Sequence, residues 1–215
     1  MLVSLKELME DAEKGGYAVG AFNVSNLESL MAIMQAAEET GRGVILNYAE
    51  VHAPFLSMEQ AALIMLDAAK KAKVPVCVHL DHGSSMESCI QAIRLGFTSV
   101  MLDASAEDYE TNVRETKEIV RLAHSVGVTV EAELGHIFSS DMGLAESPKE
   151  AETLESFDSA EDVYTDPATA KDFVERTGVD VLAIAFGTTH GIYTKKPKLD
   201  LERISNEIGN KYNEL

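Results

Sequence analysis

The 215-residue sequence contains no tryptophan and only two cysteines, and it is poor in positive charge. Two cysteines, Cys77 and Cys89, cannot form the framework of a disulfide-rich secreted domain, so we expect a reducing, cytoplasmic environment. Eighteen basic residues against 36 acidic ones give a net charge of −18, which argues against nucleic acid and anionic membranes as partners. A negatively charged substrate is not excluded, because a few local donors or a metal can outweigh a distant net charge.

The sequence also lacks a long apolar run at its start. The opening segment, residues 1–14, carries acidic residues from Glu7 onward and has the pattern of a short amphipathic helix. It therefore predicts neither a signal peptide nor a transmembrane segment. With 46% hydrophobic residues, the chain has enough apolar side chains for the core of one large soluble domain.

Strand and helix patterns alternate strictly along the chain. Apolar runs predict six strands, at 17–24, 44–46, 76–83, 98–102, 128–134 and 179–186. Helical repeats with capping residues follow them, and the expected helix starts are Ser25 with Glu28, Ser57 with Gln60, Ser84 with Glu87, Ser105 with Asp108, Asp166 with Pro167, and Leu201.

Six such units predict an α/β fold with parallel strands and right-handed crossovers. A doubly wound sheet and a (β/α)8 TIM barrel both satisfy this rule, and the regular repetition favours the barrel. The count is about two units short, and the sequence stops at Leu215 inside an expected helix. We therefore expect residues 1–215 to form a single barrel domain that is incomplete at its C-terminus, since six units cannot close a barrel.

The segment from residue 135 to 166 differs from the rest of the chain. It holds nine acidic residues and a single base, Lys149. Loops of this length in compact domains are usually functional or disordered. The segment is thus interpreted either as a solvated, mobile loop or as an active-site lid inserted in the domain.

Four expected strand ends carry residues that can do chemistry. These residues are Asp81 and His82, Asp103, Glu131 and Glu133, and the run from Gly187 to Gly191 that contains His190. The carboxyl ends of parallel strands meet at one edge, where α/β enzymes place their sites. Glu131 and Glu133 share one face of their strand, and buried acids are costly unless they are paired or bind a metal. Histidines and carboxylates in this setting predict a divalent-metal site with nitrogen and oxygen ligands.

Structural roles are the alternative for each of these residues. A single strand-end histidine is more often a hydrogen-bonded structural residue, and His52, His79 and His124 are interpreted in this way. We favour a core role for Glu131, held by an internal ion pair, whereas Asp103 and Glu133 lie nearer the rim. His82 and His190 differ because each precedes a glycine, which allows close backbone approach and positive φ.

The motifs that contain these residues resemble those of the class II, zinc-dependent ketose-bisphosphate aldolases, which include the fructose-1,6- and tagatose-1,6-bisphosphate enzymes. The resemblance covers nearly the whole chain. The matching segments are residues 15–23 (GGYAVGAFN), 79–83 (HLDHG), 130–135 (VEAELG), 164–167 (YTDP), 187–191 (GTTHG) and 198–200 (KLD).

The resemblance implies a (β/α)8 barrel that cleaves a ketose bisphosphate reversibly to dihydroxyacetone phosphate and an aldehyde, commonly glyceraldehyde 3-phosphate. It also implies roles for single residues. His82 and His190 match two of three zinc-ligand histidines, and the third belongs to an HGGSG motif on a seventh strand that this sequence does not reach. Asp103 and Glu133 match a second or alternative divalent-metal position, Asp81 matches the acid that takes the C4 hydroxyl proton, and Asn23 and Gly191 match substrate-binding positions.

The expected chemistry explains these residue types. Breaking the C3–C4 bond leaves negative charge on the dihydroxyacetone phosphate fragment, which Zn²⁺ stabilises as a Lewis acid. Three departures from the family pattern concern the substrate. Asp141 stands where the family has a catalytic loop glutamate, Thr194 replaces a lysine, and Glu50 lies near the expected distal phosphate, which it would repel.

These departures leave other functions open. The alternatives are an aldolase for a different phosphorylated ketose, another metal-dependent barrel lyase, and a non-catalytic barrel subunit of the same family. The family is usually dimeric or tetrameric, so we expect a homo-oligomer.

Overall fold

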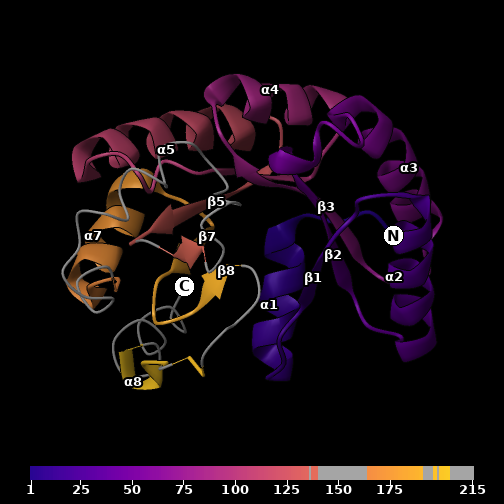
Figure 1. Cartoon of the computed structure of the whole chain (residues 1–215), viewed down its shortest axis with the longest axis horizontal. Helices are drawn as coiled ribbons and strands as arrows, with labels where there is room; N and C mark the ends of the chain where they lie inside the picture. The colour runs from indigo at the N-terminus through magenta and orange to yellow at the C-terminus, as the bar shows by residue number, and fades with distance from the viewer. Residues whose placement is uncertain (136, 140–163, 191–195, 198, 204–215) are drawn as a thin grey trace. The chain divides into compact units, whose positions relative to one another are not determined.

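The computed structural model describes residues 1–215 except 136, 140–163, 191–195, 198 and 204–215 (Figure 1). The helices are α1 (Leu5–Gly15), α2 (Leu27–Thr40), the short 3-10 helix η1 (Glu50–His52), α3 (Met58–Lys71), α4 (Met86–Leu95), α5 (Tyr109–His124), α7 (Pro167–Thr177) and α8 (Leu201–Arg203). The strands are β1 (Gly20–Asn23), β2 (Val44–Ala49), β3 (Val76–Gly83), β4 (Ser99–Leu102), β5 (Thr129–Leu134), β6 (Phe138–Ser139), β7 (Val181–Ile184) and β8 (Thr189–His190).

Six of these strands form one sheet in the order β1-β2-β3-β4-β5-β7, and β6 pairs with β8 in a separate two-stranded sheet. The neighbours β1, β2, β3 and β4 are paired in parallel. Sequential strands that neighbour each other in parallel require crossover connections, and helices provide them here. The predicted α/β class and the six strands are confirmed. The small pair β6 and β8 was not predicted, because two-residue strands leave no periodic pattern in a sequence.

Helix starts are set by side-chain caps, and three of the predicted caps were wrong by one to three residues. The N-cap of α2 is Asn26 instead of Ser25, and the N-cap of α4 is Ser85 instead of Ser84. In both helices a serine hydroxyl three residues on completes the capping box, so the expected glutamate is not needed. At α5 the Asp108 carboxylate accepts a bond from the Thr111 N–H at 3.1 Å, so Asp108 occupies the position that was predicted for Ser105.

The other two predicted caps are confirmed. Ser57 and Gln60 form the capping box of α3, and Asp166 caps α7 with Pro167 in its first turn. Helix α4 ends before Gly96, which adopts the left-handed conformation expected of a C-cap glycine.

The chain divides into two compact units, the first of residues 1–102 and 118–131 and the second of residues 103–117 and 132–215. In the first unit, α3 packs on β2 and β3, and α4 packs on β3, β4 and α3 (Figure 1). Strands β2, β3 and β4 and helix α3 all contribute buried apolar residues to its core, whereas all four residues of β1 are exposed. Cys77 and Cys89 are buried free thiols, and burial raises the pKa of each to about 12.

In the second unit, polar contacts join the helices and the strand ends. The Arg176 guanidinium of α7 pairs with the Glu110 carboxylate of α5, and the Tyr109 hydroxyl donates to Asp172 at 2.7 Å. The Thr165 hydroxyl donates to the Leu134 carbonyl at the end of β5 and accepts from the Ala185 N–H. These bonds fix the end of β5 next to the segment that follows β7.

The helices of this fold are amphipathic and not uniformly apolar. Within the described residues, none of them combines the length and the hydrophobicity that crossing a bilayer requires.

Candidate functional site

The site begins at an irregularity in β3. Leu80 pairs with Val100 and Gly83 with Leu102, so three residue steps on β3 match two on β4. The additional residue makes a β-bulge, a feature that redirects side chains at the ends of strands. His82 lies in the bulge with φ of 47°, the one non-glycine residue with positive φ in the described part of the chain. The sequence pattern predicts this conformation for the following glycine, and the histidine carries it instead.

Asp103 directly follows β4, one residue after the partner of Gly83. Its Oδ1 atom accepts bonds from the Ser105 N–H at 3.0 Å and from the Ser105 hydroxyl at 2.7 Å. These two bonds close a tight turn after the strand, and they explain why Ser105 does not cap α5. The turn therefore fixes the carboxylate of Asp103 at the carboxyl end of β4.

Glu133 lies near the end of β5, and its side chain is buried. Its backbone carbonyl accepts a bond from the Asn112 side-chain amide of α5 at 2.9 Å, and Asn112 in turn accepts from the Thr116 hydroxyl. Both α5 residues are themselves buried. The expectation that Glu133 lies nearer the rim than Glu131 does not match its burial, because Glu133 is only 2% exposed.

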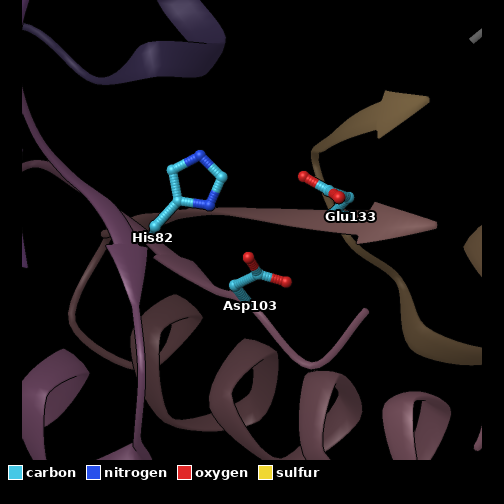
Figure 2. A group of neighbouring side chains, drawn as sticks. All are labelled: His82, Asp103 and Glu133. Atoms are coloured by element: carbon cyan, nitrogen blue, oxygen red, sulfur yellow. The ribbon is translucent and has the colours of Figure 1, made fainter. Parts of the chain in front are cut away.

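Figure 2 shows the His82 ring with the carboxylates of Asp103 and Glu133 turned toward it. One ligand atom from each of the three residues lies within 4.8 Å of the other two. One imidazole nitrogen and two carboxylate oxygens are ligands that a zinc or similar divalent ion accepts, and three protein ligands leave a position for a substrate. A buried carboxylate such as that of Glu133 is costly unless a cation or donors compensate it. The residues present thus fit a metal centre.

A row of polar residues crosses β1, β2, β3 and β4, on the N-terminal side of the strand ends that carry the metal group. In the backbone register, Asn23 of β1 pairs with Asn47 of β2, Asn47 with His79 of β3, and His79 with Ser99 of β4. The buried His79 ring makes a hydrogen bond of 2.8 Å from Nδ1 to the Ser99 hydroxyl, which confirms its structural role.

On β5, the Glu131 carboxylate lies 3.4 Å from Nε2 of His79. Burial lowers the pKa of His79 to about 4, so its imidazole is neutral at pH 7. Burial, and then the charge of Asp81, raises the pKa of Glu131 to about 7. Glu131 therefore has the internal partner that the sequence favoured, but at neutral pH the contact is polar and not a full ion pair.

Asp81 pairs in register with Ala49 and is half-buried, immediately before the bulge. Its negative charge opposes the effect of burial on the pKa of His79 and adds to the effect of burial on the pKa of Glu131.

The other predicted site residues have separate places. Asn23 is the exposed last residue of β1, and His190 is half-buried in β8, where it pairs with Ser139 of β6. The three-residue group around His82 does not include His190. Asp141 and Gly191 lie outside the described residues.

Two contributors were missed from the sequence. Ser99 was interpreted only as part of an apolar strand, although a small polar residue opposite a strand histidine is a usable signal. Glu50 was assigned to the expected phosphate site, whereas its carboxylate accepts a bond from the Ser84 N–H at 2.7 Å. No local pattern reveals such a contact, because the two residues are 34 positions apart.

Comparison with known proteins is consistent with this geometry. The family model "Fructose-bisphosphate aldolase class-II" matches residues 3–211. The fructose-bisphosphate aldolase of Thermus caldophilus is 46% identical over 207 residues, which cover 95% of this chain and 64% of that protein. The probable fructose-bisphosphate aldolase of Bacillus subtilis is 44% identical over 211 residues, 97% of this chain and 69% of that protein.

A solved structure shows the same fold. The crystal structure of the YdjI aldolase from Escherichia coli K12 has a TM-score of 0.80 and 40% identity, and the match covers 95% of this chain and 67% of that one. The chain thus spans about two thirds of the length of the proteins it matches. Since the family model covers nearly all of the sequence, the chain belongs to the class II fructose-bisphosphate aldolase family.

Proposed function

We propose that the protein is a class II aldolase, a carbon–carbon lyase that cleaves a phosphorylated ketose reversibly to dihydroxyacetone phosphate and an aldehyde. The observation that carries the proposal is the convergence of His82, Asp103 and Glu133 at the strand ends. Family membership supports the reaction type, because the matched relatives are named fructose-bisphosphate aldolases.

Zn²⁺ is the proposed cofactor, and it would supply Lewis-acid stabilisation of the negative charge that develops when the C3–C4 bond breaks. His82 is the proposed first ligand, with His190 as a second. Asp103 and Glu133 are proposed to provide a second or alternative divalent-metal position. A neutral imidazole leaves the ion its full charge, whereas the two acids would reduce it.

Asp81 is the proposed general base for the C4 hydroxyl proton in cleavage, and it returns the proton in condensation. Its half-buried position directly before His82 at the end of β3 supports this role. Asn23 and Gly191 are the proposed substrate-binding residues. Asp141 is the proposed counterpart of the family's loop glutamate for proton transfer at C3.

We propose further that the six-stranded sheet belongs to a (β/α)8 barrel formed as a single domain, with residues 135–166 as an inserted active-site loop. Two observations support the barrel: the strands follow each other in sequence order, and the YdjI aldolase shares this part of its structure with a TM-score of 0.80. We also propose that the protein is cytoplasmic and forms a homo-oligomer. Sedimentation of the purified protein tests the oligomeric state.

The proposed substrates are fructose 1,6-bisphosphate, which would give glyceraldehyde 3-phosphate, and its tagatose epimer. The sequence pattern predicts that Glu50 repels a second phosphate. Its carboxylate accepts the Ser84 N–H, so part of its negative charge is already compensated. This contact favours keeping bisphosphates among the candidates.

A cleavage assay tests the proposal. The intact protein is supplied with fructose 1,6-bisphosphate, tagatose 1,6-bisphosphate and the matching ketose monophosphates, and dihydroxyacetone phosphate is measured with and without EDTA. We expect cleavage of at least one bisphosphate, its loss in EDTA and its recovery with added Zn²⁺. Cleavage that survives complete removal of metal would contradict the mechanism, and a metal-loaded protein that cleaves none of the panel would favour a non-catalytic subunit.

A matched variant tests the base. Asp81→Asn keeps the shape of the side chain but removes its ability to take a proton. General bases contribute roughly 100-fold to 10,000-fold to a rate. We expect a loss of kcat in that range with unchanged zinc content, and an unchanged kcat would remove Asp81 from this role.

A further inference from the structure

One hydrogen bond holds the segment that follows the bulge of β3. The Glu50 carboxylate, in η1 directly after β2, accepts the backbone N–H of Ser84 at 2.7 Å. A bond to a charged acceptor is shorter and roughly twice as strong as a neutral one. Ser84 is two residues after His82, so this bond fixes the turn in which His82 lies.

A second contact holds the same turn from the other side. Gly83 lies against β4, and a Cβ atom at this position would be 2.6 Å from the Met101 carbonyl oxygen. The nearest other atoms would be a Leu80 methyl carbon at 2.9 Å and the Cys89 sulfur at 3.1 Å. Gly83 therefore has no room for a side chain against β4, and the bond to Glu50 holds the residue that follows it.

These two contacts enclose a strained residue. Positive φ costs a non-glycine residue roughly 1–2 kcal/mol, and such conformations persist only where the surrounding structure over-determines them. His82 has φ of 47° and at the same time supplies the imidazole of the metal group. Release of Ser84 would let φ of His82 return to an ordinary negative value, which would turn the imidazole away from Asp103 and Glu133.

We propose that Glu50 is a positioning residue for the metal centre: its bond to the Ser84 N–H holds His82 in the left-handed conformation that directs the imidazole to the metal. Glu50 does not contact the metal or the substrate in this role. The expected effect on zinc affinity rests on the proposed function. The expected effect on the backbone at His82 and Ser84 does not depend on it.

Three variants of the intact protein test the metal part. Glu50→Ala removes the acceptor, and Glu50→Gln keeps an oxygen that can accept the same N–H. Glu87→Ala removes a comparable charge from the exposed first turn of α4. Zinc affinity is measured by competition with a chelator, and Co²⁺ substitution reports on ligand geometry by its visible spectrum.

We expect Glu50→Ala to bind zinc roughly 10-fold to 100-fold more weakly, as is typical when a residue that orients a ligand is lost. Its Co²⁺ spectrum should change, while Glu50→Gln retains most of the affinity and Glu87→Ala retains all of it. Wild-type affinity in Glu50→Ala would overturn the inference, and so would equal losses in Glu50→Ala and Glu87→Ala.

The effect on the backbone is tested without metal, so that failure of the proposed function can be distinguished from failure of the positioning role of Glu50. We expect the Ser84 amide to exchange with solvent faster in metal-free Glu50→Ala than in wild type, and a crystal structure of the variant to show negative φ at His82. If wild type binds no zinc but these changes occur, the proposed function fails and the positioning role of Glu50 stands. Unchanged exchange and unchanged φ would overturn the positioning role itself.

Discussion

His82 combines a place in the candidate metal group with a backbone conformation that is unfavourable for a non-glycine residue. The sequence shows a histidine followed by a glycine and predicts positive φ for the glycine. In the structure His82 has the positive φ instead. The sequence does not reveal that Gly83 lacks a positive φ. Nor does it reveal that a glycine is required there because the Met101 carbonyl oxygen leaves no room for a Cβ atom. Substitution of Gly83 tests whether the close contact requires a glycine at this position.

Gly83→Ala should destabilise the protein and weaken zinc binding. The added methyl group would meet a backbone oxygen at 2.6 Å, and such overpacking costs about 1–3 kcal/mol. Gly16→Ala is the control, because Gly16 has positive φ but no atom lies within 4 Å of the place that its added methyl carbon would take. Denaturant unfolding and zinc titration measure both variants. An effect on zinc affinity from Gly16→Ala, or none from Gly83→Ala, would contradict the close-contact explanation.

His79 provides a pH prediction. Its pKa is lowered from 6.5 to about 4 by burial, so the unfolded chain takes up a proton below pH 6.5 that the folded protein refuses until about pH 4. Burial raises the pKa of Glu131 to about 7, and this shift changes stability in the opposite direction. The contribution of His79 alone falls as pH decreases through this window, by roughly 3 kcal/mol at about 1.4 kcal/mol per pH unit. The full contribution is present above pH 6.5.

The matched variant for this prediction is His79→Gln, which has no titrating group. Free energies of unfolding are measured in urea with a chelator present, between pH 7 and pH 4. We expect wild type to be the more stable at pH 7 and its advantage to shrink steadily below pH 6.5. Curves that stay parallel over the whole range would show that His79 titrates normally in the folded protein.

At the scale of the elements, the strand and helix order was predictable because apolar periodicity and capping residues are local signals. Boundaries were less accurate. Near α4 two serines, Ser84 and Ser85, stand side by side, and sequence spacing to Glu87 selected the wrong one. The structure assigns the cap to the Ser85 side chain, whereas Ser84 contributes its backbone N–H to Glu50.

Ser85→Ala and Ser84→Ala separate these roles. Loss of an N-cap serine costs about 1 kcal/mol, so we expect Ser85→Ala to lower the free energy of unfolding by that amount. Ser84→Ala keeps the backbone N–H and should change stability by less than about 0.5 kcal/mol. Denaturant unfolding checks both, and a reversed order of the two effects would return the cap to Ser84.

At the scale of the whole chain, the family and the α/β class were predictable from six matching motifs, which depend on single residues and their spacing. The group of His82, Asp103 and Glu133 was predictable in outline, since all three end successive strands of a parallel sheet. The contacts of Ser99 with His79 and of Glu50 with Ser84 were not, because they join residues far apart in the sequence.

The net charge of −18 also has an effect on the whole chain. Like charges repel in the compact state, and salt screens that repulsion over a distance of about 10 Å at 0.1 M. We expect the melting temperature to rise between 20 mM and 300 mM NaCl, by about 2–4 °C for each kcal/mol gained. A melting temperature that falls with added salt would mean that attractive charge pairs dominate.

The proposed metal centre requires that the strand ends hold a divalent ion through His82. Zinc content and dissociation constant, measured on intact wild type and on His82→Ala, test it most directly. We predict tightly bound zinc in wild type and a loss of at least about 100-fold in affinity in the variant, because losing a direct ligand should cost at least as much as the roughly 10-fold to 100-fold typical of residues that only orient one. Equal zinc content and equal affinity in the two proteins would contradict the claim.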